Sequence, residues 1–194
     1  MTDDGKVRCP YVDLNDPLYV RYHDEEWCRE SHDEHYLYEM FVLELFQAGL
    51  SWKLLLHKRE NFRRAYDGFD VKKVAAYDEQ KVQELLHDKG IIRSEAKIRA
   101  SISNSRIFMD IEKECGSFDE YIWGFSGGRQ VHDEPGLTKS ELSDAVSADL
   151  KRRGVKFAGS VTIYSYLQAI GVIDSHSREC FCYHGRSHCG RLTR

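Results

Sequence analysis

The segment Phe41-Val-Leu-Glu-Leu-Phe-Gln-Ala-Gly-Leu-Ser-Trp52 predicts the end of a buried helix, a corner and the start of a second helix. Gly49 suits the corner because glycine adopts positive φ without steric cost. Ser51 suits the next N-cap, where its hydroxyl can accept a hydrogen bond from a free backbone N–H. Glu44 differs from its apolar neighbours, and burying a carboxylate is costly unless a partner replaces its lost water. Either Glu44 lies on a wet edge of the helix, or it forms with Trp52 the floor of a pocket for a flat cation.

The composition is that of an ordinary soluble protein, with 41% hydrophobic and 31% charged residues among 194. This length allows one sizeable core or two small lobes around a cleft. The net charge of −4 argues against a general basic coat for nucleic acid, although it allows local basic patches. An apolar leader and a membrane-length apolar run are both missing from the sequence, so we expect a cytoplasmic protein with no membrane partner. Its six cysteines are then expected to be thiols or metal ligands.

Nearly all local signals predict helices, and no alternating run is long enough to predict a strand, so the expected class is all-α. Residues 1–184 are expected to form a single helical domain with two lobes around a pocket, and residues 185–194 a short, basic, disordered tail. The expected helices begin after Asp16-Pro17, Asp33, Ser51, Asp70, Asp78, Ser94, Ser117 and a capping box at Thr138-Lys-Ser-Glu141, and the last runs from Ser160 to about Ile170.

The segment 150–160 joins two predicted helices by a short connector that begins with Gly154 and ends with Gly159. Free N–H groups at Gly159 and Ser160 form a natural seat for a phosphate, and Lys156 and three further basic residues surround it. This composition is typical of a helix-hairpin-helix that grips the DNA backbone without reading sequence. The alternative is an ordinary corner with solvated charges.

The turn at residues 89–93, followed by Lys97, is a second candidate of the same kind. A single such turn is more often an ordinary corner than a DNA contact. Two of them in a chain of net negative charge favour DNA as the partner.

Cysteine and histidine residues occur near both ends of the chain, with Cys9 and His23 at one end and His176 and Cys180 at the other. Two thiolates and two imidazoles form a closed tetrahedral zinc site, which is structural rather than catalytic. His176 and Cys180 are four residues apart, so a helical turn would place them on one face. Spacing alone is equally compatible with free thiols and solvated histidines. The tail also supplies competing ligands, namely Cys182, His184, His188 and Cys189.

Four aromatic residues accompany Glu44 in the sequence: Tyr19, Tyr22, Trp27 and Trp52. In most proteins such residues belong to the core. Grouped around a carboxylate, they could instead sandwich a cationic purine, because a cation is attracted to the face of an aromatic ring.

Together these motifs resemble the type I 3-methyladenine DNA glycosylases of bacteria, over a range from about Arg8 to Tyr183. The resemblance rests on Cys9, Asp16 to Tyr19, Tyr22 to Asp24, Glu26-Trp27, Leu43-Glu44, Gln47 to Trp52, Lys58 to Asn61, Gly90 to Arg93, Gly154 to Gly159 and His176. It implies an all-α helix-hairpin-helix glycosylase, expected to be a monomer, that acts on alkylated double-stranded DNA. It also implies structural zinc, bound by Cys9, His23, His176 and Cys180, which joins the two ends of the chain.

The resemblance also implies a role for individual residues. Glu44 is the catalytic, base-recognising carboxylate, and Leu50 fills the gap that the flipped nucleotide leaves in the duplex. The pocket is lined by Tyr19, Tyr22, Trp27 and Trp52, and the phosphates are held by Gly154, Lys156, Gly159 and Ser160. Since 3-methyladenine in DNA is cationic and leaves easily, stacking and hydrogen bonding would suffice without strong acid catalysis.

Three positions bear on the expected chemistry. Ser160-Val-Thr162 stands where strand-cleaving relatives carry a lysine, so no lyase activity is expected and water is the acceptor. Asp174 is the carboxylate best placed to replace the catalytic aspartate of many helix-hairpin-helix glycosylases, although the resemblance does not require it. Cys28 and Leu45-Phe46 depart from the family pattern. The latter pair is expected to make the pocket drier, to raise the Glu44 pKa or to alter which lesions fit.

Two other hypotheses stand beside the glycosylase. The first is a damaged-DNA-binding protein of the same fold without excision activity, which would be free to lose Glu44. The second is a zinc-stapled helical interaction module unrelated to DNA, which leaves the two basic turns and the carboxylate among apolar residues unexplained.

Overall fold

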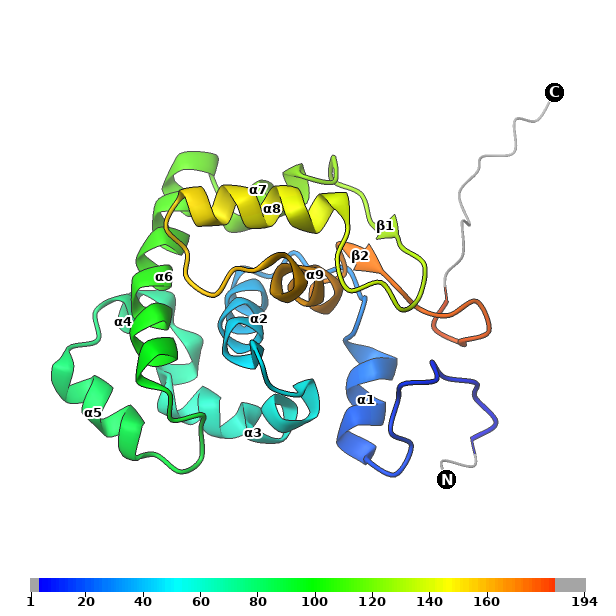
Figure 1. Cartoon of the computed structure of the whole chain (residues 1–194), viewed down its shortest axis with the longest axis horizontal. Helices are drawn as coiled ribbons and strands as arrows, with labels where there is room; N and C mark the ends of the chain where they lie inside the picture. Colours follow the sequence, from blue (N-terminus) through cyan, green and yellow to red (C-terminus); the bar gives the residue numbers. More distant parts are fainter. Residues whose placement is uncertain (1–3, 184–194) are drawn as a thin grey trace.

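The computed structural model describes residues 4–183, and this part of the chain is mostly helical, as predicted (Figure 1). Within that range, no helix is both long and apolar enough to span a membrane. The helical elements are α1 (Pro17–Glu25), α2 (Glu34–Gln47), α3 (Trp52–Ala65), the 3₁₀ turn η1 (Asp67–Phe69), α4 (Val71–Ala75), α5 (Glu79–His87), α6 (Glu95–Cys115), α7 (Phe118–Gly124), α8 (Glu141–Arg152) and α9 (Ser160–Ala169). The expected tail, residues 185–194, lies outside the described residues.

Most helix starts follow the predicted caps. The side chains that accept a hydrogen bond from the first turn are those of Asp16, Asp33, Ser51, Asp70, Asp78 and Ser117. Each satisfies a backbone N–H that has no partner inside its helix. Ser94 also precedes its helix as predicted, but no side-chain hydrogen bond caps α6 in the described chain.

Two local predictions were wrong. Helix α8 is capped by Ser140 instead of Thr138, because Ser143 occupies the third helical position and its hydroxyl oxygen accepts a hydrogen bond from the Ser140 N–H at 2.9 Å. Two short strands also occur, β1 (Val131–His132) and β2 (Ile173–Asp174), which pair in parallel. With two residues each, they carry no alternation by which a sequence could predict them.

Helix α2 lies at the centre of the molecule and contacts α3, α6, α7 and α9 (Figure 1). Its residues from Leu37 to Phe46 are all buried, which explains why its sequence is apolar almost all round. Two of them are acidic, Glu39 and Glu44. The Glu39 carboxylate pairs with Arg59 of α3 at 2.5 Å, and Arg59 also reaches Glu26 beside α1 at 2.6 Å. Three helices around the candidate pocket are thereby held together, whereas Glu44 has no such partner among residues 4–183.

The corner between α2 and α3 has the predicted geometry. Gly49 has a φ of +79°, and the Ser51 hydroxyl accepts a hydrogen bond from Leu54 N–H at 3.3 Å. The ammonium group of Lys97 on α6 donates hydrogen bonds to the carbonyls of Phe46 and Ala48, at 2.7 and 2.6 Å. These carbonyls end α2 and would otherwise lack partners. Lys97 was predicted to contribute to a phosphate site, but these hydrogen bonds hold its ammonium group at the α2–α3 corner.

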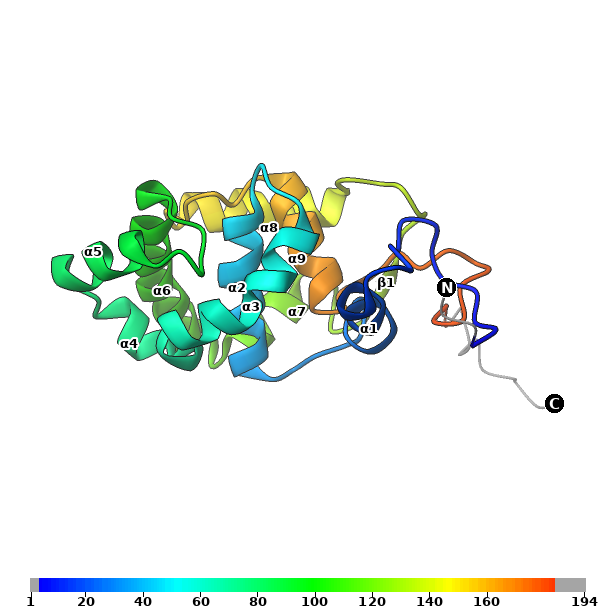
Figure 2. The ribbon, with the colours of Figure 1, turned by 90° about the horizontal axis from the view of Figure 1, so that it is seen from below.

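The two ends of the described chain meet beside α1. The N–H of Phe181 donates to the carbonyl of Val7 at 2.8 Å, and Arg8 pairs with Asp24 of α1 at 2.6 Å. Figures 1 and 2 both show the N-terminal and C-terminal segments together on the side of the molecule that carries α1. A small second core of buried residues forms there, made of Cys9, Val12, Val20, Cys180 and Cys182.

Candidate active site and metal centre

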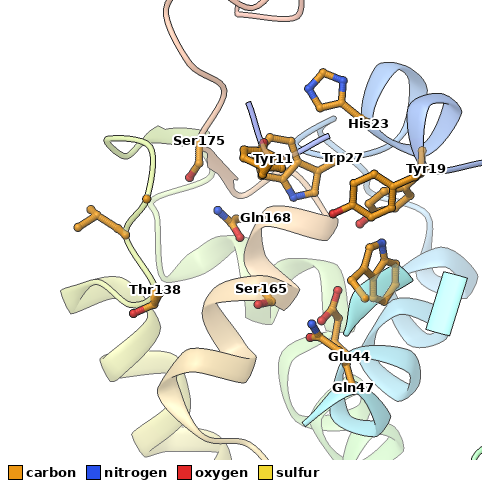
Figure 3. A pocket seen from close by; sticks show the side chains of 14 residues that line it. Tyr11, Tyr19, His23, Trp27, Glu44, Gln47, Thr138, Ser165, Gln168 and Ser175 are labelled. Carbon is orange, nitrogen blue, oxygen red and sulfur yellow. The ribbon is translucent and has the colours of Figure 1, made fainter. Parts of the chain in front are cut away.

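A cavity of about 310 Å³ opens between α1, the α2–α3 corner, α9 and the loop before α8 (Figure 3). All five residues predicted to form the base pocket line it, namely Tyr19, Tyr22, Trp27, Glu44 and Trp52. Residues more than a hundred positions apart contribute to this cavity, since Ser165 and Gln168 of α9 face Glu44 across it. The predicted grouping of the aromatic residues around Glu44 is therefore present in the structure.

The Glu44 side chain is buried, with 3% of its surface exposed, so the interpretation as a wet helix edge is wrong. Its Oε2 atom has no hydrogen-bond partner within residues 4–183, and the same is true of the indole Nε1 of Trp52. Burial raises the pKa of Glu44 from 4.5 to about 8. An acceptor and a donor, both unpaired and buried, thus line one cavity, and a polar ligand could satisfy both.

The buried carboxyl predicts a pH-dependent loss of stability. The Glu44 pKa is higher in the folded than in the unfolded state. The contribution of the Glu44 carboxyl to the free energy of unfolding is therefore fully present below pH 4.5 and is lost as the pH rises through about 8. Between pH 5 and 9, wild type should lose on the order of 4 kcal/mol of unfolding free energy relative to Glu44→Gln. Urea unfolding of both proteins across this range measures the difference, and parallel curves would contradict it.

The aromatic residues do not form one uniform stack. Tyr22 and Trp52 pack with ring centroids 5.1 Å apart and planes tilted by 45°. Trp27 also belongs to the cavity wall and lies next to Tyr11 (Figure 3), with ring centroids 5.3 Å apart. A flat ring could enter between these groups, and aromatic contacts of this kind favour a cation.

Sequence reasoning missed part of the lining. Tyr11 lies in a turn before α1, outside any helical period, so no pattern connected it with the aromatic set. The loop before α8 and helix α9 reach the cavity only through tertiary folding. The other lining residues that were missed are Gln47, Gly136, Leu137, Thr138, Ser165, Gln168 and Ser175.

A buried cluster of cysteine and histidine residues joins the two ends of the chain behind this wall. The ligand atoms of Cys9, His23 and Cys180 lie within 4.8 Å of one another, with 3.6 Å between Cys180 Sγ and His23 Nε2. His176 forms an equivalent group with Cys180 and Cys182. The four predicted ligands are therefore neighbours, and Cys182 is a fifth candidate beside them. His184, His188 and Cys189 lie outside the described residues.

Each histidine is oriented by a carboxylate. The Nδ1 atoms of His23 and His176 lie 2.8 and 2.7 Å from Asp24 Oδ1 and Asp174 Oδ1. This arrangement directs each Nε2 toward the cluster, as is common for histidines that bind a metal. His176 Nε2 is buried and has no hydrogen-bond partner among the described residues. The orphaned nitrogen and the soft thiol donors fit a metal ion. Asp174, considered above as a catalytic carboxylate, contacts His176 of this cluster.

The surroundings of Cys9 favour its thiolate form. Burial alone would raise its pKa, but hydrogen bonds from His23, Tyr11 and Ser177 outweigh that effect and lower the pKa to about 6. A thiolate is the form that binds a metal ion.

The cluster residues His176 and Cys180 meet, but not through the predicted helical turn. His176 and Cys180 do not lie on one helical face, because the chain after β2 forms turns instead of a helix. A turn in which Cys180 N–H donates to Ser177 carbonyl at 2.9 Å brings Cys180 back toward His176.

The connector between α8 and α9 is held in place by hydrogen bonds to α6. Gly154 has a φ of +95°, and the Asn104 side chain bonds both the N–H and the carbonyl of Lys156, at 2.9 and 3.0 Å. Gly159 precedes α9, and none of the described side chains caps that helix. The Ser160 hydroxyl donates to Asp144. The first N–H groups of α9 thus remain available to an anion, although Ser160 already has an acidic neighbour.

Leu50 occupies the corner between α2 and α3. Its side chain is 38% exposed, which is high for a leucine, and its N–H donates to the Gln47 carbonyl at 2.6 Å. Because Gln47 and Trp52 on either side of it line the cavity, Leu50 lies near the cavity mouth.

Comparisons with known proteins found a matching family model and several similar proteins. A family model described as methyladenine glycosylase matches residues 12–183. The chain is 43% identical to DNA-3-methyladenine glycosylase 1 of Escherichia coli (strain K12), over 92% of this chain and 97% of that protein. It resembles a crystal structure of 3-methyladenine DNA glycosylase I with a TM-score of 0.87 and 41% identity, over 91% of this chain and 100% of that one. A tyrosine-to-phenylalanine variant of a 3-methyladenine DNA glycosylase I in complex with 3-methyladenine matches with a TM-score of 0.85 and 30% identity, over 89% of this chain and 95% of that one.

Proposed function

Because the chain belongs to the methyladenine glycosylase family, we propose that the cavity around Glu44 receives the damaged base during repair. The activity of the chain is that of a DNA-3-methyladenine glycosylase acting on alkylated DNA. The observation that carries the site assignment is the buried, unpaired Glu44 carboxyl in an aromatic cavity. Such a group is costly to bury without a partner, and a cationic base would supply one.

In the proposed reaction, water replaces the base at the C1′ carbon of deoxyribose. The bond between C1′ and the base breaks, its electron pair neutralises the cationic base, and the water hydroxyl joins C1′ as a proton is released. Glu44 binds the edge of the base, while Tyr22 and Trp52 contact its faces. Extruding a nucleotide costs a few kcal/mol, least for a damaged one, and these contacts offset that cost.

The proposed DNA contacts lie on two turns. The connector with Gly154, Lys156 and Gly159 holds phosphates through the N–H groups at the start of α9, beginning with Ser160. Leu50 fills the space that the extruded nucleotide leaves, since an apolar wedge can replace a stacked base. This architecture makes α8, the connector and α9 a helix-hairpin-helix.

The proposed metal is zinc, bound by Cys9, His23, His176 and Cys180. Two thiolates and two imidazoles match a closed structural zinc site, which would supply a cross-link between the two ends of the chain. We further propose that residues 1–184 form a single domain with two lobes and that the protein acts as a cytoplasmic monomer.

A base-release assay tests this function. Incubated with methylated duplex DNA, the protein should release free 3-methyladenine and leave strands that break only after alkali treatment. Borohydride should trap no covalent protein–DNA complex, because the enzyme provides no amine at residues 160–162 to attack the sugar. Chromatography of the released base and denaturing gels give both readouts. Tight binding without release would contradict the glycosylase, and strand cleavage without alkali would contradict the hydrolytic mechanism.

A further inference from the structure

Two walls of the cavity face each other across the space proposed for the base. Glu44 lies on α2, and Ser165 and Gln168 lie opposite it, three residues apart on one face of α9 (Figure 3). The two helices pack directly against each other, and the Tyr166 hydroxyl of α9 donates a hydrogen bond to the Leu37 carbonyl of α2 at 3.2 Å. The packing of α2 against α9 therefore sets the distance between the two walls.

The wall on α9 is neutral and held in place. The backbone carbonyl of Gln168 accepts hydrogen bonds from the N–H groups of Cys28 and Gly171, at 2.9 and 3.2 Å. The Ser165 hydroxyl donates its only proton to the Val161 carbonyl at 3.3 Å, so it can offer a ligand only its lone pairs. Within residues 4–183, no lysine or arginine lines the cavity. This wall is therefore suited to a small group that carries part of a positive charge.

The chemistry of the base decides which of its atoms meets this wall. In an N3-methylated adenine nucleotide, the only N–H groups of the base belong to the amino group on C6. Beside a cation the Glu44 carboxyl is ionised, and a carboxylate accepts hydrogen bonds without donating any. Glu44 therefore binds the amino group. Since C6 and N3 are opposite corners of the six-membered ring, the methyl group on N3 then points away from Glu44, toward Ser165 and Gln168.

We propose that Ser165 and Gln168 contact the substituent on N3 and restrict the lesion to small alkyl groups. This inference rests on the proposed function and deepens it, because it names the part of the lesion that α9 recognises. Since the distance between the walls is fixed, a larger substituent would displace the amino group from Glu44 or push the ring out of its contacts with Tyr22 and Trp52. One additional methylene in an apolar pocket changes kcat/KM by roughly 10- to 200-fold.

The test compares two lesions that differ by one methylene, namely 3-methyladenine in methylated DNA and 3-ethyladenine in ethylated DNA. Release rates are measured with enzyme in excess over the lesions but below saturation, and release without enzyme is subtracted. Their ratio, methyl to ethyl, is independent of the fraction of folded protein. It should be about 10 or more in wild type and should fall at least about 5-fold in Gln168→Ala, which enlarges the space at the wall. Ser165→Val adds bulk there and should slow the release of 3-methyladenine about 10-fold or more, with an increased ratio.

Gln47→Ala is the matched control. Gln47 also lines the cavity, but it lies on α2, three residues after Glu44, and so belongs to the wall proposed to bind the amino group. The variant removes the same side chain as Gln168→Ala from the opposite wall. It should change both release rates by the same factor and leave the methyl-to-ethyl ratio at the wild-type value.

The outcomes separate this inference from the function on which it rests. If wild type releases 3-ethyladenine as fast as 3-methyladenine, the size restriction is wrong and the glycosylase assignment stands. A wild-type ratio in both Gln168→Ala and Ser165→Val, or an equal change of the ratio in Gln47→Ala, would show that the substituent does not contact the α9 wall. Failure of the wild type to release either base overturns the two proposals together.

Discussion

Glu44→Gln should release 3-methyladenine from methylated duplex DNA at least about 100-fold more slowly than wild type. The carboxyl is buried and has an unpaired oxygen inside the cavity, so its bond to a cationic base would be charge-assisted and shielded from water. Loss of one such preorganised contact lowers rates by roughly 100- to 1000-fold in other enzymes. Initial rates of base release, measured with excess enzyme, give the ratio directly. Glu44→Ala should be at least as slow.

Stability and activity move in opposite directions in this variant, which makes the result easy to interpret. Glu44→Gln removes a buried ionisable group, and we expect it to be more stable than wild type at alkaline pH. A slow reaction therefore cannot be attributed to unfolding. Glu112→Gln is the matched control, since burial also raises the pKa of Glu112 on α6, outside the cavity. Full activity in Glu44→Gln would remove Glu44 from the site.

Cys180→Ser should abolish stoichiometric metal binding and lower the melting temperature by roughly 8–16 °C. A ligand present at 1000 times its Kd stabilises the native state by about 4 kcal/mol, and for a domain of this size 1 kcal/mol corresponds to about 2–4 °C. Chelation of the wild type should produce a decrease of the same size. Metal analysis of the purified protein and calorimetry with and without chelator measure both effects.

Two further cysteines provide controls for this experiment. Cys115→Ser alters a half-buried thiol on α6, away from the cluster, and should retain the metal and the wild-type melting temperature. Cys182→Ser tests the rival ligand set, because Cys182 is near enough to His176 and Cys180 to bind the same ion. Metal retention in Cys182→Ser and loss in Cys180→Ser support the four-ligand assignment, whereas the reverse would exchange the two cysteines.

The helices could be predicted because their starts depend on a few neighbouring residues. Asp16, Asp33 and Ser51 sit directly before helices and use their own side chains to satisfy the first turn. Where two hydroxyl residues compete over a short distance, as Thr138 and Ser140 do, local sequence does not decide between them. The choice depends on Ser143, whose hydroxyl completes the capping box at Ser140.

The sequence predicts only those site residues whose chemistry differs from that of their sequence neighbours. Glu44 stood out because a carboxylate is unexpected in an apolar helix. Tyr11 and Gln168 carry no such signal, since a tyrosine and a glutamine are unremarkable at most positions, and only the fold brings them to the cavity. The proposed metal ligands were predicted through a family resemblance. Their spacing could not have shown that a turn at Ser177 brings Cys180 toward His176.

Helix α6 fixes the spacing between the α2–α3 corner and the connector that joins α8 to α9. Lys97 holds the corner that carries Leu50, and Asn104 holds the connector at Lys156. The two residues are seven positions apart, so they lie on one face of α6 with two helical turns, roughly 10 Å, between them. A single helix therefore sets the distance between Leu50, the proposed wedge, and the connector that is proposed to hold phosphates. On the proposed assignments, this length determines which nucleotide is displaced relative to the phosphate that is held.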